Sequence, residues 1–344
     1  MPHNSPKTVS SLQDLADLAG VSRATASRAL SDNPRISKKT RDRVQALAKT
    51  HGYVINRRAR DLRLQRTSII SVVFMLDMRS KQHMSDLFFM EMLGAIADAS
   101  SDRDYDLLLT HAPDSGDLDA TVNNILQRSD GVIFVGQEKR HQQLNAIAER
   151  GHPIIVWGQR VPGKHYPVVG SDNFEGGRAV TLEILSKGRS RIAFFGSVDN
   201  PELSARFSGY KAALSECGIA FDPQLHFEVP FGMEEAQPAV ARLLEQRSDF
   251  DAVVCMSDVM AMATIGALQG FGLSVPDDVA VTGYDNISLS AFTRPALTTV
   301  SQNIGMAGEA LVDGLLARIR GESVPDITLP AELVVRHSSL VTPE

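Results

Sequence analysis

The chain has 344 residues, of which 43% are hydrophobic and 22% are charged, a composition typical of a soluble globular protein with two or three domains. Its two cysteines, Cys217 and Cys255, exclude a disulfide framework and a zinc cluster of CxxC spacing, and they fit a reducing compartment. The sequence shows neither an apolar run of membrane-spanning length nor a signal-peptide core near Met1. We therefore expect a cytoplasmic protein with no membrane partner.

The net charge of -6 conceals a strong asymmetry along the chain. Residues 1–66 contain 14 basic and 5 acidic residues, a net charge of +9, whereas residues 67–344 carry a net charge of -15. A basic head on an acidic body indicates a head that binds a polyanion, with nucleic acid as the leading candidate. A solvated basic face would show the same charge balance, so the pattern inside the head has to decide.

The head has the pattern of three short helices. Ser11 to Asp14 has the form of a capping box, apolar residues follow it at helical spacing, and Gly20 ends the segment. Ser22 can cap a second helix over residues 23–30, and Ser37 can cap a third over residues 38–50. Two helices joined across a glycine turn predict a helix-turn-helix.

In a helix-turn-helix the second helix enters the major groove of DNA and presents the side chains of its first turns to the base edges. Here these side chains are Arg23, Ala24, Thr25, Ser27 and Arg28. An arginine fork matches the O6 and N7 acceptors of guanine, and the small residues let the helix seat deeply. The alternative is that the two arginines are ordinary solvent-facing charges, and the basic charge of the head favours DNA binding over it.

A specific resemblance supports this interpretation. The run LADLAGVSRATASRAL at residues 15–30, followed by SKKTRDRV at residues 37–44, resembles the head of the lactose-repressor (LacI/GalR) family of bacterial transcription regulators. Further motifs continue the match in order to the C-terminus, so the resemblance covers nearly the whole chain.

The arginine-rich connector at residues 54–66 corresponds to the hinge helix of that family, which folds on DNA. The resemblance implies that Leu62 wedges into the minor groove and kinks the duplex, although a linker leucine could also pack on the next domain. We add Asn56, Arg57 and Ala59 to the expected DNA-binding residues. Ile55 departs from the proline that is usual in relatives, which makes the entry to the hinge less rigid.

The body alternates apolar strands with helices. Strands are expected at residues 69–76, 107–109, 131–135, 153–157, 192–195, 252–256 and 279–283. Continuous apolar strands separated by helices indicate parallel sheets with both faces covered. We expect a small all-α helix-turn-helix head and an α/β body of two doubly wound parallel-sheet subdomains, similar to type I periplasmic binding proteins. The ligand should bind at the carboxyl ends of the strands, between the subdomains.

The expected boundaries follow from this arrangement. The DNA-binding domain covers residues 1–53 and the hinge covers residues 54–66. The N-subdomain covers residues 67–168 and 298–325, and the C-subdomain covers residues 169–297 and 326–344. The body carries no GxSxG, HExxH or P-loop motif, and we read it as a sensor rather than an enzyme, with no expected cofactor and no metal site.

The resemblance also implies which residues meet the effector. Arg206 in the motif ARFSGY and Asp285 in the motif VTGYDN match an arginine and an aspartate that bind it, and Ser257 stands where relatives often have asparagine. Arg206 and Asp285 could instead simply pair with each other. A pair of this kind suits the vicinal hydroxyls of a polyol.

Other residues complete the expected cleft. Phe88, Trp157 or Phe231 can cover a sugar face, Asp86 lies at the mouth, and Asp172 follows a strand end. Trp157 could equally be a core residue, and Asp172 could be a helix cap.

These expectations combine into allosteric regulation of transcription by a homodimer. The protein is expected to repress carbohydrate-utilisation genes and to leave a pseudo-palindromic double-stranded DNA operator when a glucoside or oligosaccharide binds. An alternative keeps the architecture with a nucleobase or phosphorylated metabolite as corepressor, and a more remote one is a sugar enzyme with an appended head. The sequence names neither the effector, its sign, the operator nor the target genes, and it leaves dimer against tetramer open.

Overall fold

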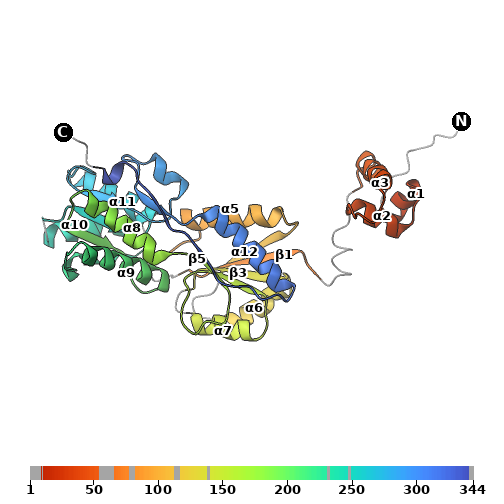
Figure 1. Cartoon of the computed structure of the whole chain (residues 1–344), viewed down its shortest axis with the longest axis horizontal. Helices are drawn as coiled ribbons and strands as arrows, with labels where there is room; N and C mark the ends of the chain where they lie inside the picture. Colours follow the sequence, from red (N-terminus) through yellow and green to blue (C-terminus); the bar gives the residue numbers. More distant parts are fainter. Residues whose placement is uncertain are drawn as a thin grey trace. The chain divides into compact units, whose positions relative to one another are not determined.

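The computed structural model describes residues 9, 11–53, 66–76, 82–111, 117–137, 140–230, 233–246 and 249–340. The chain forms two compact units, Met1–Thr67 and Ser68–Glu344, which are called here the head and the body. Figure 1 shows that the head is helical and that the body combines helices with strands.

The head consists of helices α1 (Leu12–Leu18), α2 (Arg23–Leu30) and α3 (Lys38–Thr50). The expected capping box is present, because the hydroxyl of Ser11 accepts from the Asp14 amide at 3.1 Å while the Asp14 carboxylate accepts from the Ser11 amide at 2.9 Å. Ser22 and Ser37 cap the second and third helices. Gly20 adopts φ +62° in the turn between α1 and α2, a conformation that glycine reaches without strain.

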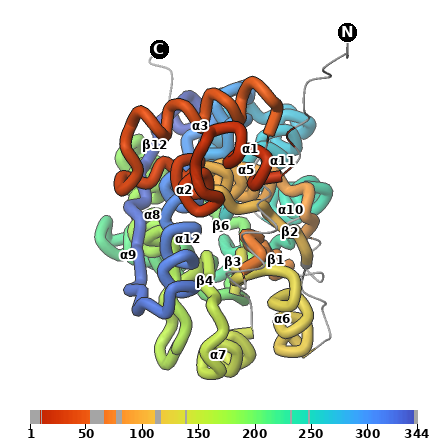
Figure 2. Tube along the Cα trace, turned by 90° about the vertical axis from the view of Figure 1, so that its right-hand side faces the viewer, coloured from red at the N-terminus to blue at the C-terminus, as the bar shows by residue number. Residues whose placement is uncertain are grey.

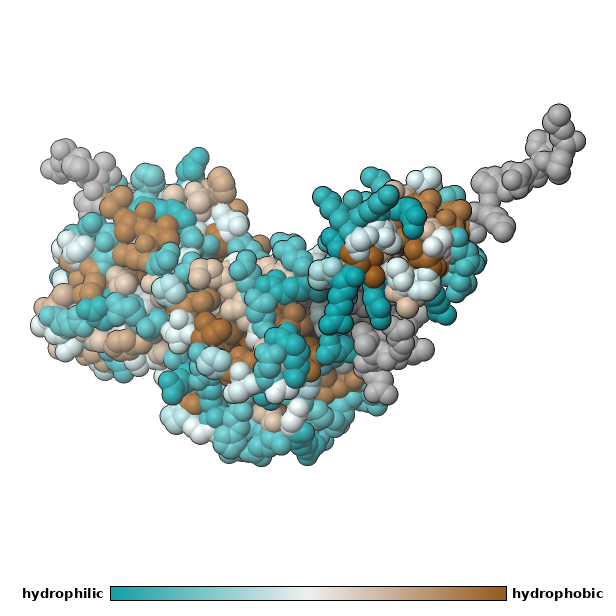
Figure 3. Space-filling view, turned by 45° about the vertical axis from the view of Figure 1, so that its right-hand side comes forward, coloured by the Kyte–Doolittle hydropathy of each residue, from teal (hydrophilic) through white to brown (hydrophobic). Residues whose placement is uncertain are grey.

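A small apolar core holds the three helices together. It is formed by residues that recur at helical spacing: Leu15, Ala16, Ala19, Ala26, Ala29, Val44 and Ala48. Figure 3 shows hydrophilic side chains over much of the visible surface of the head, with a few hydrophobic ones among them. The head therefore buries one small core and leaves its polar faces to solvent.

The N-terminal lobe of the body is built on a six-stranded parallel sheet in the order β11-β5-β4-β3-β1-β2. Its strands are β1 (Ile69–Phe74), β2 (Asp106–His111), β3 (Gly131–Val135), β4 (Ile154–Trp157), β5 (Val168–Ser171) and β11 (Ile327–Leu329). Its helices are α5 (Leu87–Ser101), α6 (Leu118–Leu126), α7 (His141–Glu149) and α12 (Ile304–Ile319).

Successive side chains of a strand point to opposite faces of this sheet, and helices cover both faces. Ile70, Val72 and Phe74 of β1 pack against α5 and α12, whereas the intervening Val73 packs against α6 and α7. Figures 1 and 2 show the same layers from two directions, with the strands between the α5–α12 pair and the α6–α7 pair. This is the doubly wound arrangement that the apolar strand runs predict.

The C-terminal lobe has a four-stranded parallel sheet in the order β7-β6-β8-β9. Its strands are β6 (Ile192–Phe195), β7 (His226–Phe227), β8 (Ala252–Cys255) and β9 (Ala280–Thr282). Its helices are α8 (Asn173–Ser186), α9 (Pro201–Glu216), α10 (Ala236–Gln246) and α11 (Asp258–Gly270), and a short 3-10 helix η4 (Ser288–Phe292) follows β9. Helices α8 and α9 pack closely together, and α10 packs on α11.

The chain crosses between the lobes three times. The first crossing leads from β5 into α8, and the other two pair as an antiparallel ribbon of β10 (Thr299–Ser301) and β12 (Glu332–Val334). The hydroxyl of Ser171 donates to Oε1 of Gln302 at 2.8 Å and so ties the first crossing to the second.

Two expected subdomain boundaries are wrong by a few residues. Strands β5 and β11 pair with the six-stranded sheet, so residues 169–171 and Ile327–Leu329 belong to the N-terminal lobe rather than to the C-subdomain. The crossings therefore fall near residues 172 and 330. The cause is that each strand continues to the cleft edge of its sheet before the chain crosses, and strand patterning alone does not indicate which sheet a short strand joins. In the described part of the chain, no helix is both long enough and apolar enough to span a membrane.

Candidate functional site

The second helix of the head presents the residues expected to read DNA. Arg23, Ala24 and Arg28 are exposed on α2, whereas Ala26 and Ala29 are buried in the core, as packing residues should be. Thr25 and Ser27 are partly buried. The Thr25 hydroxyl lies 2.8 Å from that of Ser22, so it takes part in the helix cap.

Several contacts hold α2 rigidly within the head. The side-chain amide of Gln45 on α3 donates to the Ala29 carbonyl at 3.2 Å. Arg41 pairs with Asp32 at 2.7 Å and also donates to the Ile36 carbonyl at 2.7 Å, which fixes the loop between α2 and α3. The exposed face of α2 is therefore carried on a well-braced helix. The expected hinge residues Asn56, Arg57, Ala59 and Leu62 lie outside the described residues.

A cleft with an empty volume of about 900 Å³, open solvent included, lies between the two lobes at the carboxyl ends of their strands. The residues that matter for its chemistry come from both lobes and from the crossings: Gln82, Asp86, Phe88, Phe89, Gln137, Trp157, Ser171, Asn173, Asn200, Glu202, Arg206, Ser257, Asp285 and Gln302.

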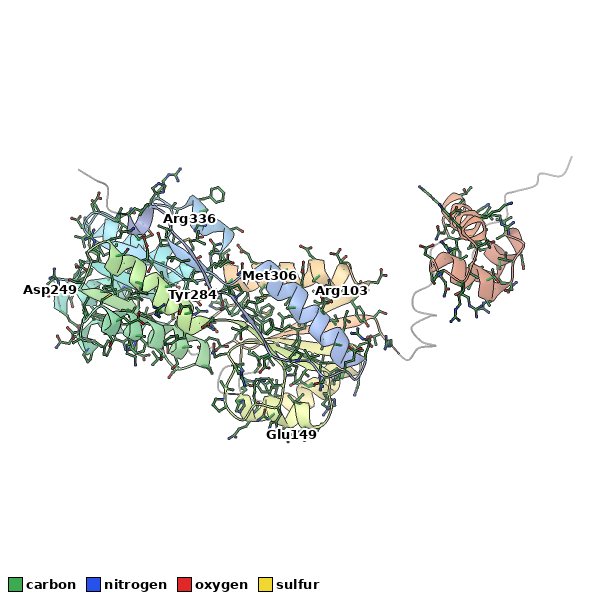
Figure 4. All side chains as sticks on the ribbon, in the orientation of Figure 1. Arg103, Glu149, Asp249, Tyr284, Met306 and Arg336 are labelled. Carbon is green, nitrogen blue, oxygen red and sulfur yellow. The ribbon has the colours of Figure 1, made fainter. Side chains whose placement is uncertain are left out.

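Arg206 of α9 is buried at the centre of this cleft. Its Nε donates to the side-chain oxygen of Asn173 at 2.8 Å, and its Nη1 donates to the Met256 carbonyl at 2.7 Å. The guanidinium carbon lies 3.7 Å from the centroid of the Tyr284 ring, a cation–π contact in the C-terminal lobe, where Figure 4 labels Tyr284. These contacts orient the guanidinium without using all of its donors.

Asp285 lies near the same guanidinium but makes no hydrogen bond with it. Its Oδ1 accepts from the side-chain amide of Gln302 at 2.6 Å and lies 3.9 Å from Nη1 of Arg206, too far for a hydrogen bond. Burial raises the pKa of Asp285 to about 6, although Arg206 and Gln302 act in the opposite direction. The pair therefore retains both donor and acceptor capacity for a ligand with adjacent hydroxyl groups.

A second buried carboxylate, that of Asp258, lies near Asp285. Asp258 of α11 accepts from the Ile287 amide at 2.9 Å and from the Thr299 hydroxyl. Burial, reinforced by the nearby charge of Asp285, raises the pKa of Asp258 well above its usual range. Asp258 thus connects α11, the loop after β9 and the second crossing.

Aromatic side chains of the N-terminal lobe form one wall of the cleft. Phe88 and Trp157 lie with ring centroids 6.5 Å apart, and Phe89 packs edge-on against Phe88 at 5.7 Å. Trp157 is only 5% exposed and also belongs to the core of the lobe, so both expected roles describe its position. Phe89 is buried and also lines the cleft.

The structure brings most of the predicted effector residues together. Those that line the cleft are Asp86, Phe88, Trp157, Arg206, Ser257 and Asp285. Asp172 does not line it, because it is exposed and its carboxylate caps α8 by accepting from the Glu175 amide at 3.0 Å. Phe231 lies outside the described residues.

Three amide side chains of the cleft, those of Asn173, Gln302 and Gln137, were not predicted from the sequence. Asn173 directly follows Asp172, and Gln302 directly follows β10, so both stand at crossings between the lobes. The side-chain oxygen of Gln137 accepts a hydrogen bond from the Gln159 backbone amide at 2.7 Å. Its side-chain nitrogen donates to the Tyr166 hydroxyl at 2.9 Å. A search of the crossing segments for Asn and Gln would have found the first two. The described residues contain no group of three or more His, Cys, Asp or Glu arranged to hold a metal ion.

Two family models match different parts of the chain. Residues 11–56 match the bacterial regulatory proteins of the lacI family, and residues 182–339 match a periplasmic binding protein-like domain. The first match covers the helix-turn-helix. The second covers most of the C-terminal lobe and also α12 of the N-terminal lobe.

Curated relatives match over nearly their whole length. The transcriptional regulator CelR of Thermobifida fusca is 31% identical over 334 residues, which cover 95% of this chain and 97% of CelR. The regulator DegA of Bacillus subtilis is 30% identical over 336 residues, which cover 95% of this chain and 97% of DegA. Because both relatives are transcription regulators, they confirm the expectation of a regulator rather than an enzyme.

Solved structures agree with this assignment. A complex of CelR with cellobiose superposes with a TM-score of 0.71 at 30% identity, covering 95% of this chain and 99% of that one. The lac repressor dimer bound to operator and an anti-inducer superposes with a TM-score of 0.75 at 25% identity, covering 96% of this chain and 99% of that one. The chain therefore belongs to the lacI family of bacterial regulatory proteins and is a DNA-binding transcription regulator.

Proposed function

We propose that this regulator represses carbohydrate-utilisation genes and is released from its operator when a glucoside or oligosaccharide binds between the lobes. The observation that carries the proposal is the partial pairing of Arg206 with Asp285 beside the Phe88–Trp157 wall. A buried guanidinium and carboxylate with spare hydrogen-bonding capacity suit adjacent hydroxyls, and aromatic rings suit the apolar face of a sugar. The solved complex of the relative CelR with cellobiose supports the same ligand class.

The charge of the cleft favours a sugar over a phosphorylated effector. Among the described lining residues, Asp86, Glu202 and Asp285 are acidic and Arg206 alone is basic. An anionic ligand would meet more like charge than opposite charge there. A nucleobase is the second candidate, because the Phe88 and Trp157 rings could also stack on a planar base.

We propose that the protein acts as a homodimer in the cytoplasm, with two heads on a pseudo-palindromic site. Apolar side chains exposed on neighbouring elements of the body support self-association. Leu87 and Met90 of α5 and Leu289 and Phe292 of η4 are exposed, and Phe292 reaches 75%. The Glu91 carboxylate of α5 accepts from the Ser288 amide of η4 at 2.7 Å, which places these elements side by side. Figure 3 shows hydrophobic patches on the visible surface of the body.

The test of the effector class uses Trp157, which is the single tryptophan of the chain and lines the cleft. Its fluorescence is recorded while glucose, cellobiose, glucose 6-phosphate and adenine are added separately to the full-length protein. The proposal expects saturable changes with a neutral saccharide and none with the phosphate ester. A response to adenine alone would contradict the sugar assignment and support the nucleobase alternative.

A further inference from the structure

Glu202 contributes negative charge to the cleft, and its position and contacts indicate a more specific role. It is the second residue of α9, directly after Pro201, and Asn200 caps this helix by accepting from the Leu203 amide at 3.0 Å. Glu202 lines the cleft together with Leu203 and Arg206 from the same helix. Glu202 therefore belongs to the C-terminal lobe and lies on the cleft face of that lobe.

The carboxylate of Glu202 is shielded from water and incompletely satisfied. Its Oε2 is buried and has no hydrogen-bond partner among the described residues. Burial is the main cause that raises the pKa of Glu202, and the amides of Glu202 and Gln159 and the charge of Arg206 counteract it only in part. Burial is the main cause that raises the pKa of Tyr166, and the charge of the Glu202 carboxylate adds to it. Gln159 and Tyr166 lie between β4 and β5, so this carboxylate is held against the N-terminal lobe.

An acidic residue in the first turn of a helix normally needs no ligand to explain it, because it stabilises the positive end of the helix dipole. Glu175 of α8 illustrates that ordinary case. Its side chain is 48% exposed and pairs with Arg178 at 2.8 Å. Glu202 differs because it has no such ion pair among the described residues and one of its oxygens is shielded without a partner. An interaction with the helix dipole does not require that this oxygen be shielded from water.

We propose that Glu202 makes closure of the cleft depend on an effector that donates a hydrogen bond to its carboxylate, and that it thereby selects against anionic effectors. Closing the lobes removes water from a carboxylate that the protein satisfies only partly, which opposes closure. A hydroxyl or ammonium group of a bound effector supplies the missing donor and removes this opposition. An anionic group at the same place would add repulsion.

This inference deepens the proposed function and rests on it for the identity of the effector, but its first test needs no effector. In Glu202→Gln the shape of the side chain is kept and the charge is removed. Glu245→Gln, at an exposed position of α10, makes the same charge change as the matched control. Acrylamide quenching of Trp157 and the melting temperature are compared among the wild type and both variants.

The expected result is that Glu202→Gln closes more readily without effector. Its Trp157 should be quenched less than in the wild type, and its melting temperature should rise by roughly 2–8 °C, the range for relief of one unsatisfied buried polar group in a body of this size. Glu202→Ala should shift both quantities in the same direction, which keeps the test valid if the amide packs badly. Quenching and melting temperatures in both Glu202 variants that equal those of Glu245→Gln, or move the opposite way, would overturn the inference.

The second arm measures selectivity with glucose, glucosamine and glucose 6-phosphate as probes, again by Trp157 fluorescence. The discrimination against glucose 6-phosphate relative to glucose should fall by about tenfold in Glu202→Gln, as expected for loss of a charge-assisted contact. Unchanged discrimination in a variant that still binds glucose or glucosamine would overturn the selective role. If the wild type binds no saccharide at all, the proposed function fails while the quenching test still decides the role of Glu202 in closure.

Discussion

Arg206 and Asp285 lie 3.9 Å apart at their nearest charged atoms, yet each is anchored by a different neighbour rather than by the other. Arg206 is held by Asn173 and by the Met256 carbonyl, while Asp285 is held by Gln302. Because Asn173 and Gln302 stand at two crossings between the lobes, the charged pair is tied to the segments that must bend when the lobes move. A ligand bridging the pair would therefore act directly on the lobe orientation.

Replacing Arg206 by lysine should separate charge from geometry. A lysine keeps the positive charge but cannot donate to Asn173 and Met256 while also reaching an effector. We expect Arg206→Lys to weaken effector binding by about 1.5–3 kcal/mol, the cost of losing a hydrogen bond to a charged group. Isothermal calorimetry with the saccharide found in the fluorescence screen measures this loss. Binding within twofold of the wild type would remove Arg206 from the effector site.

The buried carboxyl of Asp285 should give the stability of the body a distinctive pH dependence. Its pKa is raised to about 6, so the folded body binds this proton more tightly than the unfolded chain does. The resulting stability is fully present below about pH 4 and is lost as the pH rises through about 6. Relative to the wild type, Asp285→Asn should gain up to ~3 kcal/mol of unfolding free energy between these limits.

Urea unfolding at pH 4, 5, 6 and 7.5 measures this difference between the two proteins. The nearby Asp258 has its pKa raised as well, so part of the wild-type slope remains in the variant. A difference between Asp285→Asn and wild type that stays flat across these pH values would show that Asp285 does not titrate in this window.

Because α8 and α9 approach each other closely, replacing Gly177 by a residue with a Cβ should destabilise the body. A Cβ at Gly177 would lie 2.2 Å from the carbonyl oxygen of Arg206, a clash with backbone that cannot be relieved by a rotamer change. Gly177→Ala should therefore destabilise the body by about 1–3 kcal/mol and displace Arg206. Gly94→Ala on α5 is the matched control, because a Cβ at that position would meet no atom within 4 Å, and it should stabilise by up to ~1 kcal/mol. Equal melting temperatures for the two variants would contradict the packing argument.

Arg28 is the head residue whose replacement should be most informative. It is exposed on α2, outside the core formed by Ala26 and Ala29. Arg28→Ala should weaken operator binding by ~1–3 kcal/mol and relax the preference at one base position. Arg35→Ala, exposed in the loop after α2, tests the contribution of charge alone. Fluorescence anisotropy on operator variants measures both, and an equal loss on every DNA sequence would reduce Arg28 to a phosphate contact.

The sequence predicts strands of this fold most accurately where a buried run is bounded by turn residues. β3 and β6 match their expected limits, and β4, β8 and β9 differ from theirs by one or two residues. Two other limits are less accurate. β1 ends at Phe74, two residues before its expected end, and α5 begins at Leu87, whereas the sequence predicts a helix over residues 91–101. The first turn of α5 is apolar on all sides, with Phe88 and Phe89 lining the cleft and Leu87 and Met90 exposed, so it lacks the helical period that would indicate its start.

The site was predictable where a family motif marks a residue, as for Arg206, Ser257 and Asp285, and the last two also follow strand ends. Glu202 and Gln137 were not, because their roles depend on the approach of two lobes that are distant in sequence. Asp172 shows the converse error. It follows a strand end, but its side chain turns back to cap α8.

The central claim is that a sugar in the cleft controls binding of the head to DNA, and one measurement tests it most directly. Anisotropy of a labelled fragment of the upstream DNA of its own gene is recorded with the full-length protein, with and without the saccharide that changes Trp157 fluorescence. We expect specific, salt-sensitive binding that the saccharide weakens about a hundredfold, which corresponds to roughly 2.7 kcal/mol of coupling. Specific binding that remains unchanged at saturating saccharide would contradict the claim.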